Sequence, residues 1–442
     1  VRRASLPEHF ISSLRCVNGM DSGGIDFVDI LDTMMMNKTA LTLSFLSIAL
    51  AGAAASAAPS ATSGVPLRKC NTVEPPVPAS APTLSFARAC EPGESIVISA
   101  IGDILPHSTL AKQAYGSKIG FESLWARLTP YFQQVDIAYA NLEGPTAAGV
   151  AQGGRIKADP GPVLDQDVYT GTDMRFNYHP RMASDLKRSG FDIISMANNH
   201  AFDRKRVGLD LTVDVFREIG LPLVGAKKST ERGIPETVIT EAKGFRVAWI
   251  ACSEALNGAD SGGQILLCGV DQNAIVAEIQ RLTQDRTLDA IFVAPHWGDE
   301  YNHIAAKRQK VLARKFLDAG ASAIVGSHPH MLQELESYKT QDGRDTVIAY
   351  SLGNFVSGQS CKVGQRLNAL LFIGLTKRPG ERAWVNGASY LPLWMNRGNY
   401  NNDILSRSAG VPPKAMEVMS KLFDPSRELR AGQPIKTNLG CH

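Results

Sequence analysis

Two histidines separated by one proline are the residues of this sequence best placed to bind a metal ion. They occur in the segment Gly326-Ser-His-Pro-His330, directly after a short apolar run. Pro329 has a fixed φ and favours an extended conformation for the residue before it. Residues two apart in an extended chain point to the same side, so the pair suits one ion or two neighbouring ions. The alternative is a hydrogen-bonded pair of histidines in a surface turn.

The same arrangement, an apolar run that ends in ligand-type residues, occurs five more times along the chain. The runs are Ile96–Ile101 before Asp103 and His107, Val135–Ala140 before Asn141 and Glu143, Phe191–Met196 before Asn198-Asn199-His200, Ala290–Ala294 before His296, and Val347–Leu352 before Asn354. Short β-branched runs of this kind predict buried strands. Parallel strands of one sheet present their carboxyl ends on the same side, and binding sites form there. We therefore expect these residues to converge in one pocket.

The candidate ligands have the side-chain types of a transition-metal site. They are Asp103, His107, Glu143, Asn199, His200, His296, His328 and His330. Carboxylate, imidazole and amide oxygen together favour Mn²⁺, Zn²⁺ or Fe, as one ion or two, over Ca²⁺ alone. A carboxylate such as Glu143 can bridge two ions, and a water between them can then attack phosphorus or a carbonyl. A histidine beside the ions can protonate the leaving group.

Further residues near these strand ends are candidates for orienting the ligands or lining the pocket. Trp297 and Tyr301 either stack on a substrate or pack against a neighbouring loop. Glu300 either orients His296 or carries a charge at a helix N-terminus. Candidates for the pocket wall are Asn198, Asp203 and Asn354. The chain has no Gly-x-Ser-x-Gly nucleophile elbow and no Walker loop to indicate another mechanism.

The elements that must position these residues alternate between strand and helix patterns, which predicts an α/β protein. Helical periodicity is present in segments 121–133, 180–189, 207–219, 271–285, 305–319 and 414–423. Antiparallel strand pairs are expected at 238–241 with 246–251, and at 367–375 with 383–391. Segment 144–175 is rich in Gly and Asp and shows no periodicity. It is either a substrate lid or a solvated insertion.

Composition and charge narrow the class of protein. The 442 residues are 44% hydrophobic and 20% charged, which is ordinary for a globular protein. The formal net charge of +3 is small and the chain lacks a dense basic stripe. Both features argue against nucleic acid as a partner.

The N-terminal part resembles an export signal that begins inside the given sequence. Residues 1–33 fit neither a fold nor a targeting signal, which indicates a mis-assigned upstream start. Residues 34–57 predict a signal peptide: Met34–Lys38 precede an uncharged run and the cleavage pattern Ala55-Ser56-Ala57. Periplasmic or extracellular localisation follows. The alternative is an uncleaved membrane anchor, because the apolar run is near the length of a span. Residues 58–93, rich in Pro and Ala, predict a linker or arm.

Cysteine usage agrees with export. Cys16 lies upstream of the signal, and six cysteines follow it, an even number typical of disulfides in exported proteins. Buried free thiols are the alternative. The absence of a Cys-x-x-Cys pair argues against a thiolate zinc site. Fifteen pairings are possible, and proximity in sequence favours Cys252–Cys268, Cys70–Cys90 and Cys361–Cys441.

Six motifs in order resemble those of the CapA family of capsule proteins, which belongs to the metallophosphatase (calcineurin-like) superfamily. They are Gly-Asp-Ile-Leu at 102–105, Asn-Leu-Glu-Gly-Pro at 141–145, Ala-Asn-Asn-His-x-x-Asp at 197–203, His-Trp-Gly-x-Glu-Tyr at 296–301, Gly-Ser-His-Pro-His at 326–330 and Tyr-Ser-Leu-Gly-Asn-Phe at 350–355. The resemblance covers roughly residues 95–375. It implies a four-layered α/β/β/α sandwich in a metallophosphatase-fold domain over 94–392, followed by a C-terminal extension, 393–442.

The resemblance also implies roles for the site residues. The implied roles are Asp103 and His330 on a first metal, Glu143 as the bridge, Asn199, His296 and His328 on a second metal, and His200 as an acid beside them. The chain departs from the superfamily pattern at three positions. The nearest histidine after Asp103 is His107, four residues on instead of two. Glu143 replaces an aspartate, and Lys205 stands where the family usually has glycine.

Two functions are compatible with this pattern. The first is a metal-dependent hydrolase or transferase of capsule biosynthesis that acts on an envelope polymer or a phosphorylated precursor. The second is a non-catalytic factor that binds polymer during poly-γ-glutamate assembly or export. The partners implied by the resemblance are an anionic polymer such as poly-γ-glutamate and the membrane proteins of capsule synthesis and export.

Overall fold

The structure is a computed structural model that describes residues 71–172, 175–258 and 262–441. The predicted upstream extension 1–33, the signal peptide 34–57 and the first part of the predicted linker, 58–70, lie outside these residues. Within the described ranges, no helix combines the length and apolarity needed to cross a bilayer.

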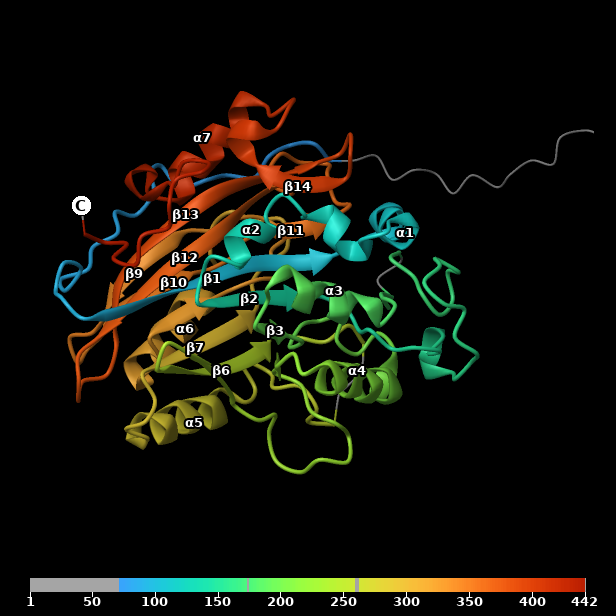
Figure 1. The fold of residues 1–442 in the computed structure, drawn as a ribbon, viewed down its shortest axis with the longest axis horizontal. Coiled ribbons are helices and arrows are strands. Elements are labelled where there is room, and N and C mark those ends of the chain that lie inside the picture. Colours follow the sequence, from blue (N-terminus) through green and yellow to red (C-terminus); the bar gives the residue numbers. More distant parts are fainter. Residues whose placement is uncertain (1–70, 173–174, 259–261, 442) are drawn as a thin grey trace, which may run out of the picture. The chain divides into compact units, whose positions relative to one another are not determined.

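The described residues build two mixed β-sheets (Figure 1). The first sheet has the order β14-β13-β12-β1-β2-β3-β4, with β11 paired to the end of β1. Its strands are β1 (Glu94–Leu105), β2 (Ile137–Leu142), β3 (Ile193–Ser195), β4 (Leu223–Val224), β11 (Asn354–Ser357), β12 (Leu367–Lys377), β13 (Trp384–Asn396) and β14 (Asn401–Ile404). Strands β1 to β4 and β11 run parallel, whereas β12, β13 and β14 form an antiparallel extension.

The second sheet has the order β5-β6-β7-β8-β10-β9. Its strands are β5 (Val238–Ala242), β6 (Phe245–Ser253), β7 (Ala290–His296), β8 (Ala323–Val325), β9 (Leu335–Lys339) and β10 (Asp345–Ala349). The central strands β6, β7, β8 and β10 are parallel, and the edge strands β5 and β9 are antiparallel. The predicted antiparallel pairs are therefore confirmed as β5 with β6 and β12 with β13.

Helices connect most of the parallel strands. They are α1 (Ser108–Gly116), α2 (Thr129–Phe132), α3 (Arg181–Ser189), α4 (Lys205–Ile219), α5 (Gln272–Gln284), α6 (Lys307–Ala319) and α7 (Pro413–Leu422), with 3₁₀ turns at Gly120–Leu124, Gln152–Gly154, Leu405–Arg407 and Pro425–Arg427. The single helix predicted over 121–133 is wrong, because it divides into a 3₁₀ turn and the short α2. Pro130 lacks an N–H and disfavours a helical residue before it, so a continuous helix cannot pass through this point.

The two sheets pack face to face, and β7 shows why. Its residues alternate between two hydrophobic clusters: Ala290, Phe292 and Ala294 belong to the core shared with the first sheet, whereas Ile291 and Val293 pack with α5 and α6. A strand with both faces apolar must be covered on both sides. Between the sheets, Tyr139 of β2 stacks on Trp249 of β6 with a centroid distance of 5.2 Å.

The outer face of each sheet carries helices. Met182 and Leu186 of α3 and Phe216 of α4 are buried in the same core as the first sheet, and α5 and α6 cover the second sheet (Figure 1). The predicted layered α/β architecture is confirmed by this arrangement.

Segments on either side of the predicted domain 94–392 pack against it. In the part of the predicted linker that is described, Leu84 and Phe86 are buried in the core. At the other end, β13 continues through residue 393, and Phe423 packs edge-on against Tyr390 of that strand. The flanking segments therefore pack on the same core as the predicted domain. The domain boundaries at 93 and 392 remain predictions.

Disulfide connectivity agrees with the sequence prediction at one bridge. Cys252–Cys268 is confirmed. Cys90 is bonded to Cys441, 351 residues away, so the predicted pairings Cys70–Cys90 and Cys361–Cys441 are wrong. The prediction used proximity in sequence, whereas the C-terminal segment folds back beside Ala89, where Gly440 approaches it. Cys361 is also disulfide-bonded.

Candidate metal centre

The predicted site residues meet at the carboxyl ends of strands from both sheets. Asp103 lies near the end of β1, directly between Asn141 of β2 and Asn354 of β11. His296 ends β7 in the second sheet and pairs with Ser327, which follows β8. The prediction that the strand ends of a single sheet converge is therefore wrong in detail. Two sheets contribute because their parallel strands end at the same side of the molecule.

The side chains form two groups with metal-ligand spacing. One group is Glu143, His296 and His328, and the other is Asp103, Glu143 and His330. Within each group the candidate ligand atoms all lie within 4.8 Å of one another. Glu143 belongs to both groups, so its carboxylate could contribute a ligand atom to each of them.

Glu143 is the side chain whose surroundings most clearly fit a cation. It is fully buried, and neither carboxylate oxygen has a hydrogen-bond partner among the described residues. Its nearest cationic candidates are His296 Nε2 at 3.5 Å from Oε1 and His330 Nδ1 at 3.9 Å from Oε2. A buried carboxylate without donors is costly. A divalent ion would remove this cost, so the residues present fit the metal that their types predict.

The pKa shifts describe a site with ionised acids. Burial alone would raise the pKa values of Asp103 and Glu143, but the neighbouring His330 and His296 lower both below their usual range. Burial and the neighbouring His296 and His330 lower the pKa of His328 to about 2, so its imidazole is neutral. Against burial, Glu143 and Asp103 raise the pKa of His330 to about 9. Ionised carboxylates and a neutral His328 are the protonation states that metal ligands require, whereas His330 would have to release a proton to bind an ion.

The turn that carries His328 and His330 is not extended, contrary to the sequence prediction. Their φ angles are 101° and 56°, a region that non-glycine residues adopt at a cost of about 1–3 kcal/mol each. The turn around Pro329 places the two ring centroids 6.0 Å apart. His328 thereby joins one ligand group and His330 the other. Backbone strain at this turn is compensated by the tertiary contacts that define the site.

His296 is held by several polar side chains. Its Nε2 lies 2.8 Å from Asn199 Oδ1 and 3.1 Å from His328 Nδ1, and its Nδ1 lies 2.9 Å from Ser327 Oγ. Asn141 Nδ2 donates to Asp103 Oδ1 at 2.8 Å. Asn141 was expected at a strand end but not as a candidate ligand, and Ser327 was not among the candidate residues. Asn141 lies two residues before Glu143, and Ser327 lies directly before His328. These positions inside the motifs could have identified both residues.

His200 lies beside the two ligand groups. Its Nδ1 is 2.8 Å from Asp203 Oδ2, and its Nε2 is 4.0 Å from Glu143 Oε1. Phe176 packs edge-on against the imidazole at 4.7 Å, and its backbone N–H donates to Asp203. Burial alone would lower the pKa of His200, but Asp203 raises it. The arrangement favours a charged, oriented imidazole at the edge of the site.

Two of the predicted pocket residues, Asn198 and Asn354, donate hydrogen bonds to backbone carbonyls near the candidate ligands. Asn354 Oδ1 lies 3.0 Å from His330 Nδ1, and its amide donates to the carbonyl of the same residue. Asn198 Nδ2 donates to the Leu142 carbonyl at 2.8 Å. His107 lies outside both ligand groups: its Nδ1 is 3.0 Å from the Leu105 carbonyl and 3.1 Å from Gly358 N.

The aromatic residues after His296 divide between the core and the site. Trp297 is buried in the cluster under α5 and α6, and its indole donates to the Tyr350 carbonyl. Tyr301, with φ of 60°, places its ring centroid 5.8 Å from that of His330. Glu300 is exposed and lies beside Tyr301, where it raises the pKa of the phenol after the effect of burial. The described contacts do not join Glu300 to His296.

The described part of segment 144–175, predicted to be a lid or a solvated insertion, is held to the rest of the chain by buried polar groups. Ala151, Val168 and Tyr169 form a small apolar cluster. Arg204 is fully buried, and its guanidinium donates to the backbone carbonyls of the segment, including that of Val150 at 3.1 Å. Because Arg204 follows Asp203 directly, the segment is tied to the residue that orients His200.

Comparisons with known proteins identify relatives for the central part of the chain. The family model described as "Bacterial capsule synthesis protein PGA_cap" matches residues 97–359. "Capsule biosynthesis protein CapA" of Bacillus anthracis is 27% identical over 275 residues, 60% of this chain and 61% of that protein. "PGA biosynthesis protein CapA" of Bacillus subtilis (strain 168) is 29% identical over 266 residues, 59% of this chain and 63% of that protein. The chain thus spans about three fifths of each relative.

Solved structures show weaker similarity. A hypothetical protein from Thermus thermophilus has a TM-score of 0.40 and 18% identity, covering 67% of this chain and 98% of that chain. A 5′-nucleotidase precursor from the same organism has a TM-score of 0.39 and 14% identity, covering 74% of this chain and 58% of that chain.

Proposed function

The chain belongs to the bacterial capsule synthesis protein (PGA_cap) family, and we propose that it is a metal-dependent hydrolase or transferase of the cell envelope. Its substrate is an anionic capsule polymer such as poly-γ-glutamate, or a phosphorylated precursor of one. The observation that carries this proposal is Glu143, a buried carboxylate without a hydrogen-bond partner among the described residues, shared by two groups of ligand atoms.

The residues that would hold metal follow from the two groups. Asp103, Glu143 and His330 would hold one ion, and Glu143, His296 and His328 the other, with the Asn199 amide oxygen close by. This donor set suits Mn²⁺, Zn²⁺ or Fe. When bound, such ions polarise a phosphoryl or carbonyl oxygen and lower the pKa of a coordinated water.

His200 supplies the proton for the leaving group in this proposal. Its Nδ1 is engaged by Asp203, so Nε2 is the atom that faces the site and can donate. Phe176 limits rotation of the imidazole by packing against its edge. Asp203 is a positioning residue, because it orients His200 without reaching the ligand groups.

Export to the periplasm or the exterior is part of the proposal. The disulfides Cys252–Cys268 and Cys90–Cys441 are compatible with an oxidising compartment. Membrane proteins of capsule synthesis and export are the proposed partners, since the family members named above act in capsule biosynthesis.

Elemental analysis tests the proposed function directly. Protein purified without chelators and supplied with Mn²⁺ or Zn²⁺ should carry metal, His328→Ala should lose it, and the control His179→Ala should keep it. His179 lies outside both ligand groups and beside Asp159. Turnover is measured on a generic phosphodiester and on poly-γ-glutamate. If wild type carries no metal and its polymer binding is unaffected by His328→Ala, the protein is a non-catalytic polymer-binding factor instead.

A further inference from the structure

A small cavity lies beside the metal centre, between the start of α1 and the ends of β11 and β13. Its volume is about 190 Å³, and its lining includes His107, Ser108, Thr172, Ser357, Arg397 and Tyr400. Its lining residues include hydroxyl groups and one arginine, and none of them is acidic. A cavity of this composition favours a small anionic group over a cation.

His107 connects this cavity to the metal centre. Its ring packs edge-on against Phe176 at 5.3 Å, and Phe176 contacts His200 at 4.7 Å. Gly358, which also lines the cavity, directs its N–H at His107 Nδ1. A substrate group bound in the cavity would therefore lie one aromatic layer from the proposed proton donor.

Arg397 provides the positive charge of the cavity. Its side chain is exposed, and in the described part of the chain it forms no ion pair with a carboxylate. Its charge adds to burial in lowering the pKa of Arg366, which shows that two guanidinium groups lie near each other here. The Arg397 guanidinium is therefore available to a ligand.

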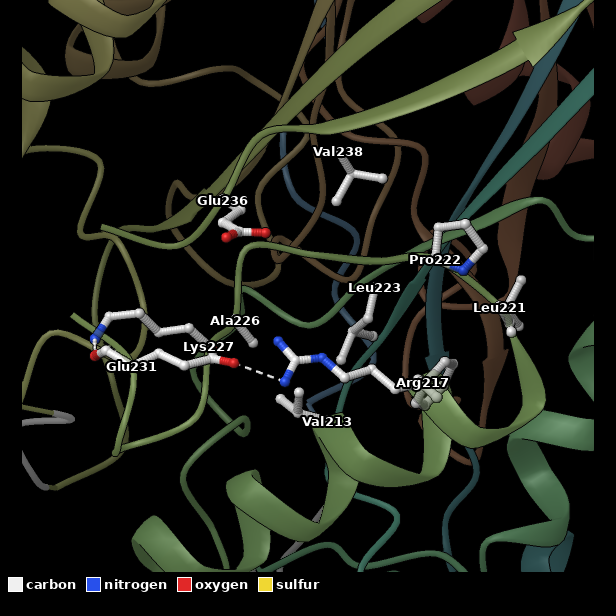
Figure 2. A pocket seen from close by; sticks show the side chains of 12 residues that line it. Val213, Arg217, Leu221, Pro222, Leu223, Ala226, Lys227, Glu231, Glu236 and Val238 are labelled. Atoms are coloured by element: carbon white, nitrogen blue, oxygen red, sulfur yellow. Dashed lines mark hydrogen bonds and ion pairs between the residues drawn. The ribbon is translucent and has the colours of Figure 1, made fainter. Parts of the chain in front are cut away.

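In a second cavity, the cationic side chains already have partners (Figure 2). Its volume is about 320 Å³, and its lining includes apolar side chains such as Val213 and Leu223. Among its charged lining residues, Arg217 pairs with Glu231 at 2.6 Å, and Lys227 donates to the backbone carbonyl of Glu231. The cations of this cavity are already compensated, so it offers a matched control for Arg397.

We propose that the cavity at Arg397 is an anion subsite that binds a carboxylate or phosphate group of the substrate. The inference rests on the proposed function, because it places a recognition group beside the reacting centre. A repeating anionic chain would present one charged group to the metal centre and a neighbouring one to Arg397. Arg397 supplies a charge-assisted hydrogen bond to that second group.

Direct binding to the full chain, treated with a chelator, tests the subsite without using turnover. The probes are a short oligoglutamate, tripolyphosphate and the neutral oligoglutamine, titrated calorimetrically at low salt. Arg397→Gln should weaken binding of the anionic probe about tenfold, as expected for loss of one charged hydrogen-bond partner. Arg217→Gln should bind as wild type does. Thermal unfolding of each variant controls for folding, which an exposed side chain should not disturb.

The outcomes separate the two possible anions and the two proposals. Arg397-dependent binding of oligoglutamate assigns the subsite to carboxylates, and dependence seen only with tripolyphosphate assigns it to phosphate. Equal binding by Arg397→Gln and wild type, or no binding of either anion, overturns the subsite. The proposed function is then still decided by the metal content and turnover of wild type. Binding through Arg397 in a protein that carries no metal would leave the subsite standing and reject the metal-dependent chemistry.

Discussion

Glu143 is the residue at which stability and function oppose each other. Its carboxylate is buried near Asp103, His200, His296 and His330, and its oxygens lack hydrogen-bond donors among the described residues. Burial of a charge without full compensation is costly, and a sequence optimised only for folding would replace it with an apolar or amide side chain. A divalent cation held at the proposed site would offset this cost.

Glu143→Gln should abolish metal binding and leave the metal-free fold intact. Metal that binds only the folded state stabilises wild type by about 2.7 kcal/mol when its concentration is about 100 times Kd, and the variant should lose this increment. The measurement is thermal unfolding with and without Mn²⁺ or Zn²⁺, together with elemental analysis. A metal-free variant that unfolds at a much lower temperature than metal-free wild type would show that the carboxylate has a structural role.

Substitution of His200 should lower turnover without loss of metal, unlike substitution of the candidate ligand histidines. His200→Ala should lower turnover by about 100- to 10,000-fold, the usual contribution of a general acid, with metal content unchanged. Asp203→Asn should lower kcat less and leave KM unchanged, because the amide keeps an acceptor for the Phe176 N–H and loses only the charge that orients the imidazole. Metal loss in His200→Ala would instead identify it as a ligand.

At the scale of elements, the sequence predicted where the strands end and not how the turns after them are shaped. Asp103, His296 and the other candidate ligands could be placed because apolar runs stop just before them. The positive φ angles of His328 and His330 could not be predicted, because they depend on contacts with other elements, such as the contact of the Asn354 side chain with His330. The pairing of Asn141 with Asp103 required the register of β1 and β2.

A described part of the N-terminal segment fixes a loop near the site through Glu74. Its carboxylate accepts hydrogen bonds from Val363 N and Gly364 N, each at 2.8 Å, and lies 2.9 Å from His303 Nε2. Burial alone would raise the pKa of Glu74, but His303 and these amides lower it below its ordinary value of 4.5. A depressed pKa in the folded state stabilises the fold above the unfolded value and loses that effect as pH falls through the folded value.

Glu74→Gln should therefore destabilise the protein by about 1–3 kcal/mol near neutral pH, the range for hydrogen bonds to a charged group. The difference from wild type should stay constant down to about pH 5 and shrink as the pH falls below 4.5. Urea unfolding of both proteins across this range measures it, and the titration of other carboxylates cancels in the difference. A difference that persists to strongly acidic pH would contradict a role for the charge.

For the whole molecule, the sequence predicted two layers of sheet through a resemblance and missed how the ends of the chain are joined. Continuous apolar runs such as 290–294 indicate buried strands, yet they carry no information about which cysteines pair. The partner of Cys90 is set by the path of the chain after β13, which returns across the first sheet to place Cys441 beside it. Long-range closure of this kind is a property of the assembled fold.

Export should remove the predicted signal. Mature protein isolated from the periplasm or medium should begin near Ala58, because Ala55-Ser56-Ala57 follows an uncharged run in the sequence. N-terminal sequencing of the exported form measures this. Recovery of an intact Met34–Ala57 segment in the membrane fraction would show that it is an anchor.

The Cys90–Cys441 bridge should contribute more to stability than the Cys252–Cys268 bridge. In the chain-entropy model a cross-link restricts the unfolded chain according to the length of the loop it closes, and the two sequence separations are 351 and 16 residues. The model gives about 6 kcal/mol for the long loop and about 3 kcal/mol for the short one. Residual structure in the unfolded chain reduces both values.

Paired serine variants, Cys90→Ser with Cys441→Ser and Cys252→Ser with Cys268→Ser, measure this order by urea unfolding under non-reducing conditions. Peptide mapping first verifies the connectivity in wild type. The first pair should lower the free energy of unfolding more, and it should also loosen Leu84 and Phe86, whose segment is tied to the C-terminus by this bridge. Proteolysis near residue 84 in the first pair alone would locate the effect. A larger loss in the second pair would show that local packing around β6 outweighs closure of the chain.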